Sequence, residues 1–329
     1  MPNLLSLNDA FSDSVELTAA IQTSKYNPGQ IAKLKLFEES GVATTSVAID
    51  YIDNALKMLP TSPRGGVGEP HRSASRSVVT VQATHIATVA SVYADEVQDQ
   101  RAFGLANGLD TPEALRMRRL SSMKTNLELT VEQHRAGAIR GLVQDTDGST
   151  LLDTYAAFGI TQTVYPMDLG GVGNLVNKSI GAERECERAL GGEDPTGFLA
   201  LSSPSFMDAL RANGYYDSAI RFAAPGTMLA GYRSGITIGD TTYIEVRSTP
   251  GLPVKIPAGE GYMIPLGIAG LFLTRFAPGD YLSTVNQPGL PAYVQSQAMQ
   301  MDKGWRLEAQ SNHVSLCTRP LAVVKLTAA

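Results

Sequence analysis

The stretch TPEALRMRRLSSMKTNLELTVEQHRAGAIRGLVQDTDG, residues 111–148, decides the fold because it carries the strongest periodic signal in the chain. Its apolar positions recur at spacings of three and four, the period of a helix that buries one face. These positions are Leu120, Met123, Leu127, Val131, His134, Ala138 and Leu142. Asp110 or Thr111 can cap the first turn, Pro112 suits its first position, and the turn sequence DTDG ends the stretch. We therefore predict one helix over 111–142, about 48 Å long.

A long hairpin is predicted before this helix. Residues 44–60 and 77–97 alternate and are rich in β-branched side chains, as strands are. Between them lies TSPRGGVGEPHRSAS, residues 61–75, with three glycines, two prolines and three serines, which is typical of a loop. A hairpin over 44–97 would reach about 50 Å at about 3.3 Å per residue. It must therefore either fold back onto a sheet or lie on another molecule.

The tip of this hairpin, residues 61–76, is basic. It carries Arg64, Arg72 and Arg76 against Glu69. Without interleaved aromatic residues, the arginines are only a weak nucleic-acid signal. We predict that these four residues belong to a subunit interface. The three arginines are expected to meet an acidic surface of a neighbouring copy, with phosphate binding and a solvated loop as the alternatives.

The remaining segments predict an α+β protein. Residues 1–30 form an N-terminal arm with a short helix near 14–23, and 31–43 link it to the first strand. Helices are predicted over 179–192, before a glycine pair, and over 202–220. Tyr232 to Val246, divided by Gly239 and Asp240, predicts a hairpin. Further strands are predicted over 254–267 and 271–278, and two alternating segments over 304–329.

Composition excludes several classes of protein. The 329 residues are 43% hydrophobic and 18% charged, which indicates a folded chain, and no apolar run approaches the length of a membrane span. The first residues hold acids where a signal peptide carries bases. Only two cysteines, Cys186 and Cys317, are present, so no disulfide framework is implied and a reducing compartment fits.

Charge alternates along the chain although the net charge is only −5. Residues 111–143 hold six bases and three acids, whereas residues 144–200 hold nine acids and three bases. In a monomer this is solvated surface. In an assembling protein, unlike patches on neighbouring copies would meet. The negative total argues against a surface that binds nucleic acid along its whole length.

No pattern in the sequence predicts catalysis or a cofactor. Neither G-x-S-x-G nor a phosphate-binding loop is present, and the glycines of DLGGVGN, residues 168–174, have the wrong spacing for a dinucleotide. The four histidines are His71, His85, His134 and His313, and none stands in a zinc-binding context. Since His134 lies on the apolar seam of the long helix, we predict a core or interface histidine rather than a base. We expect no catalytic, cofactor or metal site.

Four stretches in order resemble the major capsid protein E family, the lambda-type head proteins of tailed double-stranded DNA phages. The first of them is LKLFEESGVATTSVAIDYIDNALKMLP, residues 34–60. The long helix holds T-x-E-x-x-R-x-G-A, with Glu132 and Arg135, before the DTDG turn. APGDYLSTVNQPGLPAYVQ, residues 277–295, holds N-x-x-G-L-P-x-Y. The end of the chain holds the closing Q-S-N…R-P pattern, in which His313 stands where a proline is commoner. The matching positions of these last two motifs are Asn286, Gly289, Pro291, Ser311, Asn312, Arg319 and Pro320.

The resemblance implies the Hong Kong 97-type capsid fold. By this likeness 44–97 is the extended loop, 98–194 a peripheral domain with 111–142 as its spine helix, 195–310 mainly an axial domain, and 311–329 a closing strand that returns to the peripheral domain. The implied function is a shell of pentamers and hexamers around double-stranded DNA, assembled in the bacterial cytoplasm. Expected partners are a separate scaffold protein, a portal and a decoration or cement protein. The alternative is an encapsulin-like compartment or another phage structural protein, such as a decoration or tail-tube protein.

Overall fold

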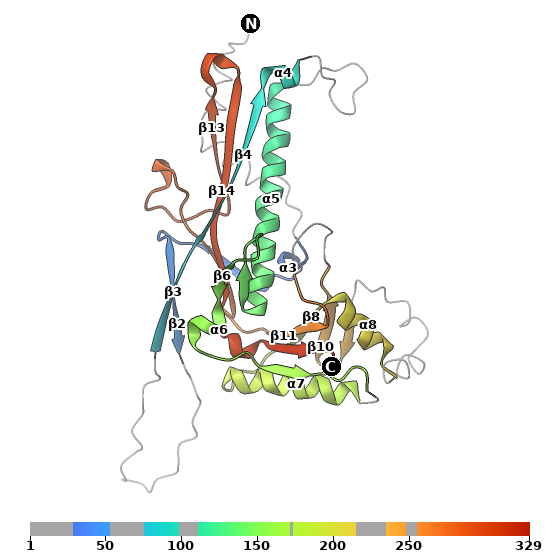
Figure 1. Ribbon diagram of the computed structural model, residues 1–329. Coiled ribbons are helices and arrows are strands. Elements are labelled where there is room, and N and C mark those ends of the chain that lie inside the picture. The colour runs from blue at the N-terminus through green and yellow to red at the C-terminus, as the bar shows by residue number, and fades with distance from the viewer. Residues whose placement is uncertain (1–28, 53–75, 99–110, 172–173, 215–234, 248–254) are drawn as a thin grey trace, which may run out of the picture. The chain divides into compact units, whose positions relative to one another are not determined.

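The computed structural model describes residues 29–52, 76–98, 111–171, 174–214, 235–247 and 255–329 (Figure 1). The chain divides into two compact units. Unit 1 is Met1–Val47, Val81–His134 and Thr274–Ser315, and unit 2 is Ala48–Thr80, Arg135–Leu273 and Leu316–Ala329. The division falls within the helix α5 and the strand β14, so each contributes residues to both units.

A five-stranded sheet forms around β14 (Gly304–Cys317). The strand order is β1 (Phe37–Gly41), β12 (Phe272–Phe276), β14, β13 (Tyr293–Ala298), and β4 (Thr84–Tyr93) also pairs with β14. β13 and β4 both run antiparallel to β14, so that Gln310 lies opposite Tyr293 on one side and opposite Ala87 on the other. The first part of β14 therefore lies between two strands that are distant in sequence.

Helix α5 (Pro112–Arg140) supplies the core of unit 1 and confirms the helix predicted over 111–142. Leu120, Met123 and Leu127 are buried in one cluster with apolar residues of β4, β13 and β14. Thr111 is the cap, since its Oγ1 accepts a hydrogen bond from the Ala114 N–H at 3.2 Å. The helix ends where Gly141 takes φ +78, a conformation that glycine adopts at low cost.

Part of the predicted hairpin lies within the described residues. β2 (Ser46–Ile52) pairs with β3 (Arg76–Gln82), and residues 53–75 lie outside the described part. The single strand predicted over 77–97 is wrong: β3 ends before Ala83, whose N–H donates to Thr45 O, β4 follows, and α4 (Ala94–Val97) ends the segment. β4 pairs with β14 and so belongs to the five-stranded sheet. The sequence does not predict this pairing, because an alternating pattern indicates a strand but not the strand with which it pairs.

The six-stranded sheet lies wholly in unit 2. Its order is β7 (Val164–Pro166), β15 (Val324–Thr327), β11 (Glu260–Leu266), β8 (Gly197–Ser202), β10 (Thr241–Glu245) and β9 (Ile236–Ile238). β8 runs parallel to β10 and β7 parallel to β15, whereas the other pairs are antiparallel. The β9–β10 pair, which turns at Gly239 and Asp240, confirms the hairpin predicted there.

Two helices complete the core of unit 2. α7 (Leu175–Leu190) begins at Asn174, whose Oδ1 accepts from the Val176 N–H at 2.9 Å, and it ends at Gly191 with φ 67. α8 (Pro204–Ala212) begins at Ser203. The buried cluster joins these helices to the sheet through Cys186, Phe206, Met207, Leu210, Tyr243 and Met263. The predicted helix over 202–220 is thus shorter, and residues 215–220 lie outside the described part.

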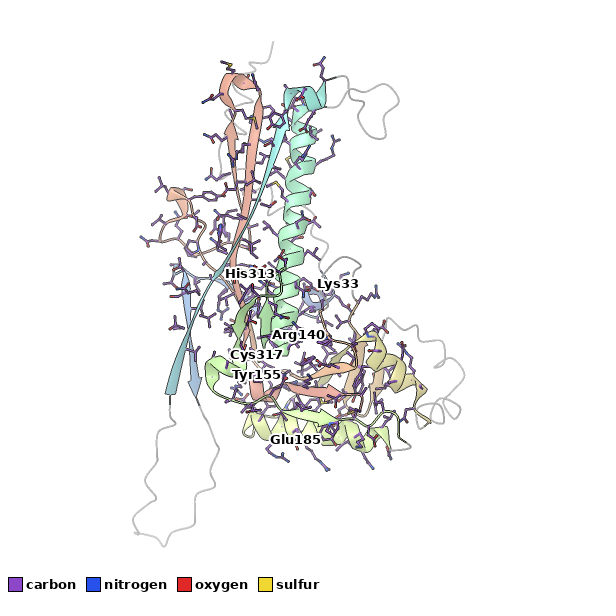
Figure 2. All side chains as sticks on the ribbon, in the orientation of Figure 1. Lys33, Arg140, Tyr155, Glu185, His313 and Cys317 are labelled. Carbon is purple, nitrogen blue, oxygen red and sulfur yellow. The ribbon has the colours of Figure 1, made fainter. Side chains whose placement is uncertain are left out.

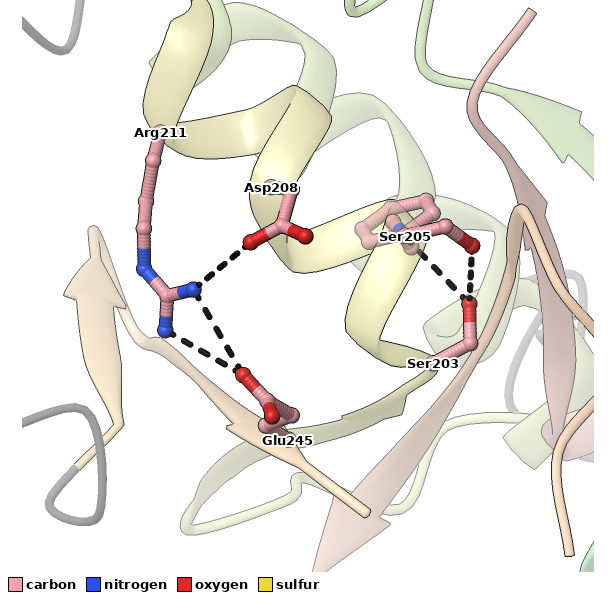
Figure 3. Close-up of polar contacts among 6 residues, drawn as sticks. Ser203, Ser205, Asp208, Arg211 and Glu245 are labelled. Carbon is pink, nitrogen blue, oxygen red and sulfur yellow. Dashed lines mark hydrogen bonds and ion pairs between the residues drawn. The ribbon is translucent and has the colours of Figure 1, made fainter. Parts of the chain in front are cut away.

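Polar contacts hold α8 at both ends (Figure 3). Ser203 Oγ accepts from the Phe206 N–H at 3.3 Å, which satisfies one of the free N–H groups of the first turn. In the last turn, Arg211 donates to Asp208 at 3.2 Å and to Glu245 of β10 at 3.4 Å. The helix is therefore tied to the sheet by an ion pair as well as by its apolar face.

The remaining elements are short. β5 (Leu142–Gln144) and β6 (Thr150–Asp153) form a hairpin across the predicted DTDG turn, and α6 (Thr154–Phe158) follows. α3 (Gln30–Lys33) precedes β1, and three 3₁₀ turns are η2 (Leu282–Thr284), η3 (Gln300–Asp302) and η4 (Pro320–Ala322). None of the helices in the described part of the chain has the length and apolarity to span a membrane.

Candidate subunit-contact surfaces

The Glu132 carboxylate binds the first turn of α3. One carboxylate oxygen accepts from the Ile31 N–H at 2.6 Å and the other from the Ala32 N–H at 3.1 Å. These are first-turn N–H groups of α3, which no residue of that helix can bond. A Cβ on Gly29 would clash with the same carboxylate. The predicted motif position Glu132 is therefore an anchor for α3, and the predicted arm before Gly29 lies outside the described residues.

Asn312 anchors the loop that follows β12. Its Nδ2 donates to Pro278 O at 2.7 Å, and its backbone carbonyl accepts from the Ala277 N–H at 2.7 Å. Its Oδ1 lies 2.8 Å from His85 Nδ1, which also lies 3.4 Å from the Asp280 carboxylate. A buried amide thus ties β4 and β14 to the base of residues 278–291, which we call the apolar loop.

Three positions of the N-x-x-G-L-P-x-Y motif shape the apolar loop. Asn286 has φ 61, a left-handed conformation that asparagine tolerates better than most residues. A Cβ on Gly289 would clash with the carbonyl oxygens of Phe276 and Ala277. The Tyr293 hydroxyl accepts from the Leu290 N–H at 2.8 Å. The motif therefore specifies backbone geometry, and Pro291, also in the motif, ends the loop on an exposed position.

The apolar loop presents large hydrophobic side chains to solvent. Leu282 is 97% exposed, Val285 58% and Leu290 42%. The loop is also held in place, since Thr284 Oγ1 donates to Gly279 O at 2.6 Å. Single exposed leucines are ordinary, but three apolar side chains on one hydrogen-bonded loop are typical of a contact surface. Sequence reasoning missed this surface because the same residues were used only as a family motif.

The histidines of β14 and α5 lie in the core of unit 1. His134 Nδ1 and His313 Nε2 are 3.0 Å apart, and both side chains are buried (Figure 2 labels His313). Ser311, a motif residue, lies 3.5 Å from His313 Nδ1 through its Oγ. The prediction of a core histidine at position 134 is confirmed.

The other predicted positions lie in unit 2 or outside the described part. Arg135 is buried on α5. Arg319 Nη1 pairs with Glu193 at 2.9 Å, and Pro320 is buried at the start of η4. Of the tip residues, Arg76 is the first residue of β3, whereas Arg64, Glu69 and Arg72 lie outside the described residues. The interface role of these four tip residues therefore stays a prediction.

The two cysteines are poor nucleophiles. Both are buried and free, and burial raises the pKa of each thiol to about 12. Both therefore stay protonated at neutral pH. Within the described ranges, no group of three His, Cys, Asp or Glu side chains is arranged to hold a metal ion.

Comparison with known proteins identifies the family. A sequence model of the family described as phage major capsid protein E matches residues 13–328. The chain belongs to the phage major capsid protein E family. This capsid protein is 23% identical to the major capsid protein of Salmonella phage Felix O1, over 95% of both chains. The predicted family is thus confirmed, and it is a family of structural proteins of the phage capsid.

Solved structures confirm the α+β capsid fold of the Hong Kong 97 type. The capsid protein resembles a putative capsid protein of an Escherichia coli CFT073 prophage with a TM-score of 0.58, 9% identity, and coverage of 96% and 99% of the two chains. It also resembles the capsid of cyanophage P-SCSP1u with a TM-score of 0.55, 13% identity, and coverage of 93% and 90%. At such identities the likeness concerns the fold alone.

Proposed function

We propose that this capsid protein assembles, through pentamers and hexamers, into an icosahedral shell that encloses the double-stranded DNA of a tailed phage or prophage. The observation that carries the proposal is the apolar loop. This loop is held by several hydrogen bonds and yet exposes Leu282, Val285 and Leu290 together, which is typical of a surface that another molecule covers. In a shell, a neighbouring copy would be that surface.

The segments take their roles from the same proposal. Residues 1–30 would be the arm, 44–97 the extended loop over a neighbour, and 111–142 the spine helix of a peripheral domain at 98–194. Residues 195–310 would build most of the axial domain, and 311–329 would close the peripheral domain. Pairing of β2 with β3 at the base of 53–75 supports the extended loop. Each contact is modest, but closed symmetry repeats it many times.

Partners and location follow from the shell. We propose a separate scaffold protein, a portal and a decoration or cement protein as partners, with assembly in the bacterial cytoplasm. DNA would be enclosed without sequence-specific binding. The net charge of −5 supports this, because a negative wall does not hold the polyanion.

Expression of the chain in a bacterial host tests the proposal. Negative-stain electron microscopy with sedimentation should show shells, tubes, or rings of five and six copies. Assembly that needs a scaffold should appear on co-expression with the head proteins encoded beside the gene. A stable monomer or dimer in both experiments contradicts the proposal.

A further inference from the structure

A cavity in unit 2 has no role in the fold described above. It has a volume of about 530 Å³ and lies where the end of α5, α6, β11 and β15 meet. Its lining includes Arg140, Tyr155, Gln162, Glu260, Tyr262 and Lys325. Figure 2 labels two of these lining residues, Arg140 and Tyr155. All of the lining belongs to a single unit, so the cavity is a property of that unit alone.

The walls of the cavity are held by hydrogen bonds. Gln162 Nε2 donates to Arg140 O and to the Tyr155 hydroxyl, both at 3.1 Å, and the Tyr155 hydroxyl donates to Pro320 O at 3.4 Å. A Cβ on Gly141 would clash with the Tyr155 ring, so the ring can occupy this position only because residue 141 is a glycine. The cavity is therefore a formed site and not a gap between loose side chains.

Three of the four charged side chains in the lining already have partners. Lys325 Nζ pairs with Glu260 at 2.6 Å, and the Tyr262 hydroxyl donates to the same carboxylate at 2.8 Å. The Asp153 carboxylate accepts from the Ala156 N–H at 3.0 Å and caps α6. The fourth charged side chain of the lining, Arg140, takes no part in these ion pairs and hydrogen bonds.

Arg140 has only weak neutral acceptors. Its Nη2 lies 3.4 Å from Leu142 O and 3.2 Å from Gln144 Oε1, and its Nε is buried without a hydrogen-bond partner. Among the described residues it forms no ion pair. Charge-assisted hydrogen bonds to a carboxylate are stronger than hydrogen bonds to neutral acceptors such as these. A carboxylate that enters the cavity would therefore be a stronger partner for Arg140 than either of its present acceptors.

The geometry points to an acidic side chain of a second copy of this chain as that partner, bound to Arg140 in the cavity. The inference rests on the proposed function, which surrounds each copy with others. Charge complementarity supports it, because unit 2 exposes carboxylates that form no hydrogen bond or ion pair within the described part of the chain. These are Glu187, Asp194 and Asp240.

Cross-linking in assembled particles tests the source of the carboxylate. Thr161, an exposed residue of the cavity lining, is changed to cysteine and carries a photo-activated cross-linker. Particles are assembled from a mixture of ¹⁴N- and ¹⁵N-labelled copies, so that mass spectrometry separates links between copies from links within one. We expect mixed-label links to a peptide that carries Asp or Glu. Links within one copy only, or links to peptides without an acid, overturn the inference.

Arg140→Gln tests the ion pair, with Arg188→Gln as the matched control. Arg188 also carries one charge in unit 2, but it is exposed and pairs with Glu185 on its own helix. Arg140→Gln should lower the cross-link yield and the association constant between subunits by about tenfold or more, since a charged hydrogen bond is lost. Arg188→Gln should leave both unchanged. Equal effects of the two variants contradict the inference.

Two further measurements keep the test decisive. If Arg140→Gln fails to fold, a double variant exchanges the two charges: Arg140→Glu is combined with a lysine in place of the cross-linked acid. This double variant should assemble. If it does not, the ion pair is contradicted. If inorganic phosphate stabilises the shell and no mixed-label links form, the anionic partner of Arg140 is a free anion, and the inference that a second copy supplies it is overturned. Failure of the unaltered chain to form particles would instead contradict the proposed function, so the two failures are distinguishable.

Discussion

The Glu132 carboxylate accepts two backbone N–H groups from residues that lie 100 and 101 positions earlier in the chain. The contact is a cap supplied by tertiary structure rather than by a neighbour in sequence. The four residues of α3 cannot form a stable helix alone, because nucleation costs more than one turn returns. The helix therefore depends on this carboxylate and on the absence of a side chain at Gly29.

Glu132→Ala should release α3. Hydrogen bonds to a charged group contribute roughly 1.5–3 kcal/mol each, so we expect the free energy of unfolding to fall by about 2 kcal/mol. Hydrogen exchange should accelerate at the amides of Ile31 and Ala32. Glu113→Ala is the control, because Glu113 is exposed in the first turn of α5. Unchanged exchange at both amides in Glu132→Ala would refute the anchoring role.

Single residues show what sequence could and could not specify. The sequence already indicates a cap at Asp110 or Thr111 and the turn at Gly239, because both features depend on neighbours within four residues, and the structure selects Thr111 as the cap. The Glu132 role could not be predicted, since it requires the meeting of two distant segments. The sequence pattern includes Asn286 and Gly289 but does not show why they are needed. Only the fold shows that carbonyl oxygens exclude a Cβ at Gly289.

Helix α5 is the element whose burial pattern is clearest. Leu127 is 3% exposed and packs in the core of unit 1, whereas Leu129, half a turn away, is 37% exposed. Leu127→Asp should place an unpaired carboxylate in an apolar cluster, at a cost of several kcal/mol, roughly the whole stability of many domains. We expect loss of soluble, folded protein, measured by circular dichroism and soluble yield.

Leu129→Asp is the matched control for this helix. It makes the same chemical change on a partly exposed position, and surface substitutions usually alter stability by about 0.5 kcal/mol or less. We expect a folded protein. Normal folding of Leu127→Asp, or equal loss in both variants, would mean that the buried face is assigned incorrectly.

Strand β4 shows where prediction of elements fails. The alternation over 84–93 correctly indicates a strand, but the same pattern suits pairing with either β3 or β14. The fold chooses β14 because Val92 joins Leu307 and Ala309 in one apolar cluster. Such a choice depends on tertiary packing, which a local alternation does not encode. The length of α5, in contrast, follows from local spacing and caps.

At the scale of the whole molecule, substitutions in the apolar loop can distinguish an effect on assembly from an effect on folding. Leu282 is 97% exposed, so Leu282→Asp should change the free energy of unfolding of the subunit by no more than about 0.5 kcal/mol. A new charge in a covered contact should nevertheless impair shell formation, measured by sedimentation and electron microscopy. Gln287→Asp adds the same charge to an exposed position of the same loop. Shells as abundant in Leu282→Asp as in Gln287→Asp would exclude a contact through Leu282.

The segment between β2 and β3 gives the last test of the assembly proposal. The chain leaves the hairpin at Ile52 and returns at Arg76, and residues 61–75 hold two of the three tip arginines. Deletion of 61–75 removes no described residue, so the subunit should fold with an unchanged thermal transition while shells are reduced. Replacement of 61–75 by fifteen Gly and Ser residues keeps the length but removes the charges. If that variant also forms few shells, the side chains of the tip make the contact; if it assembles normally, length alone is required and the predicted role of Arg64, Glu69 and Arg72 is wrong.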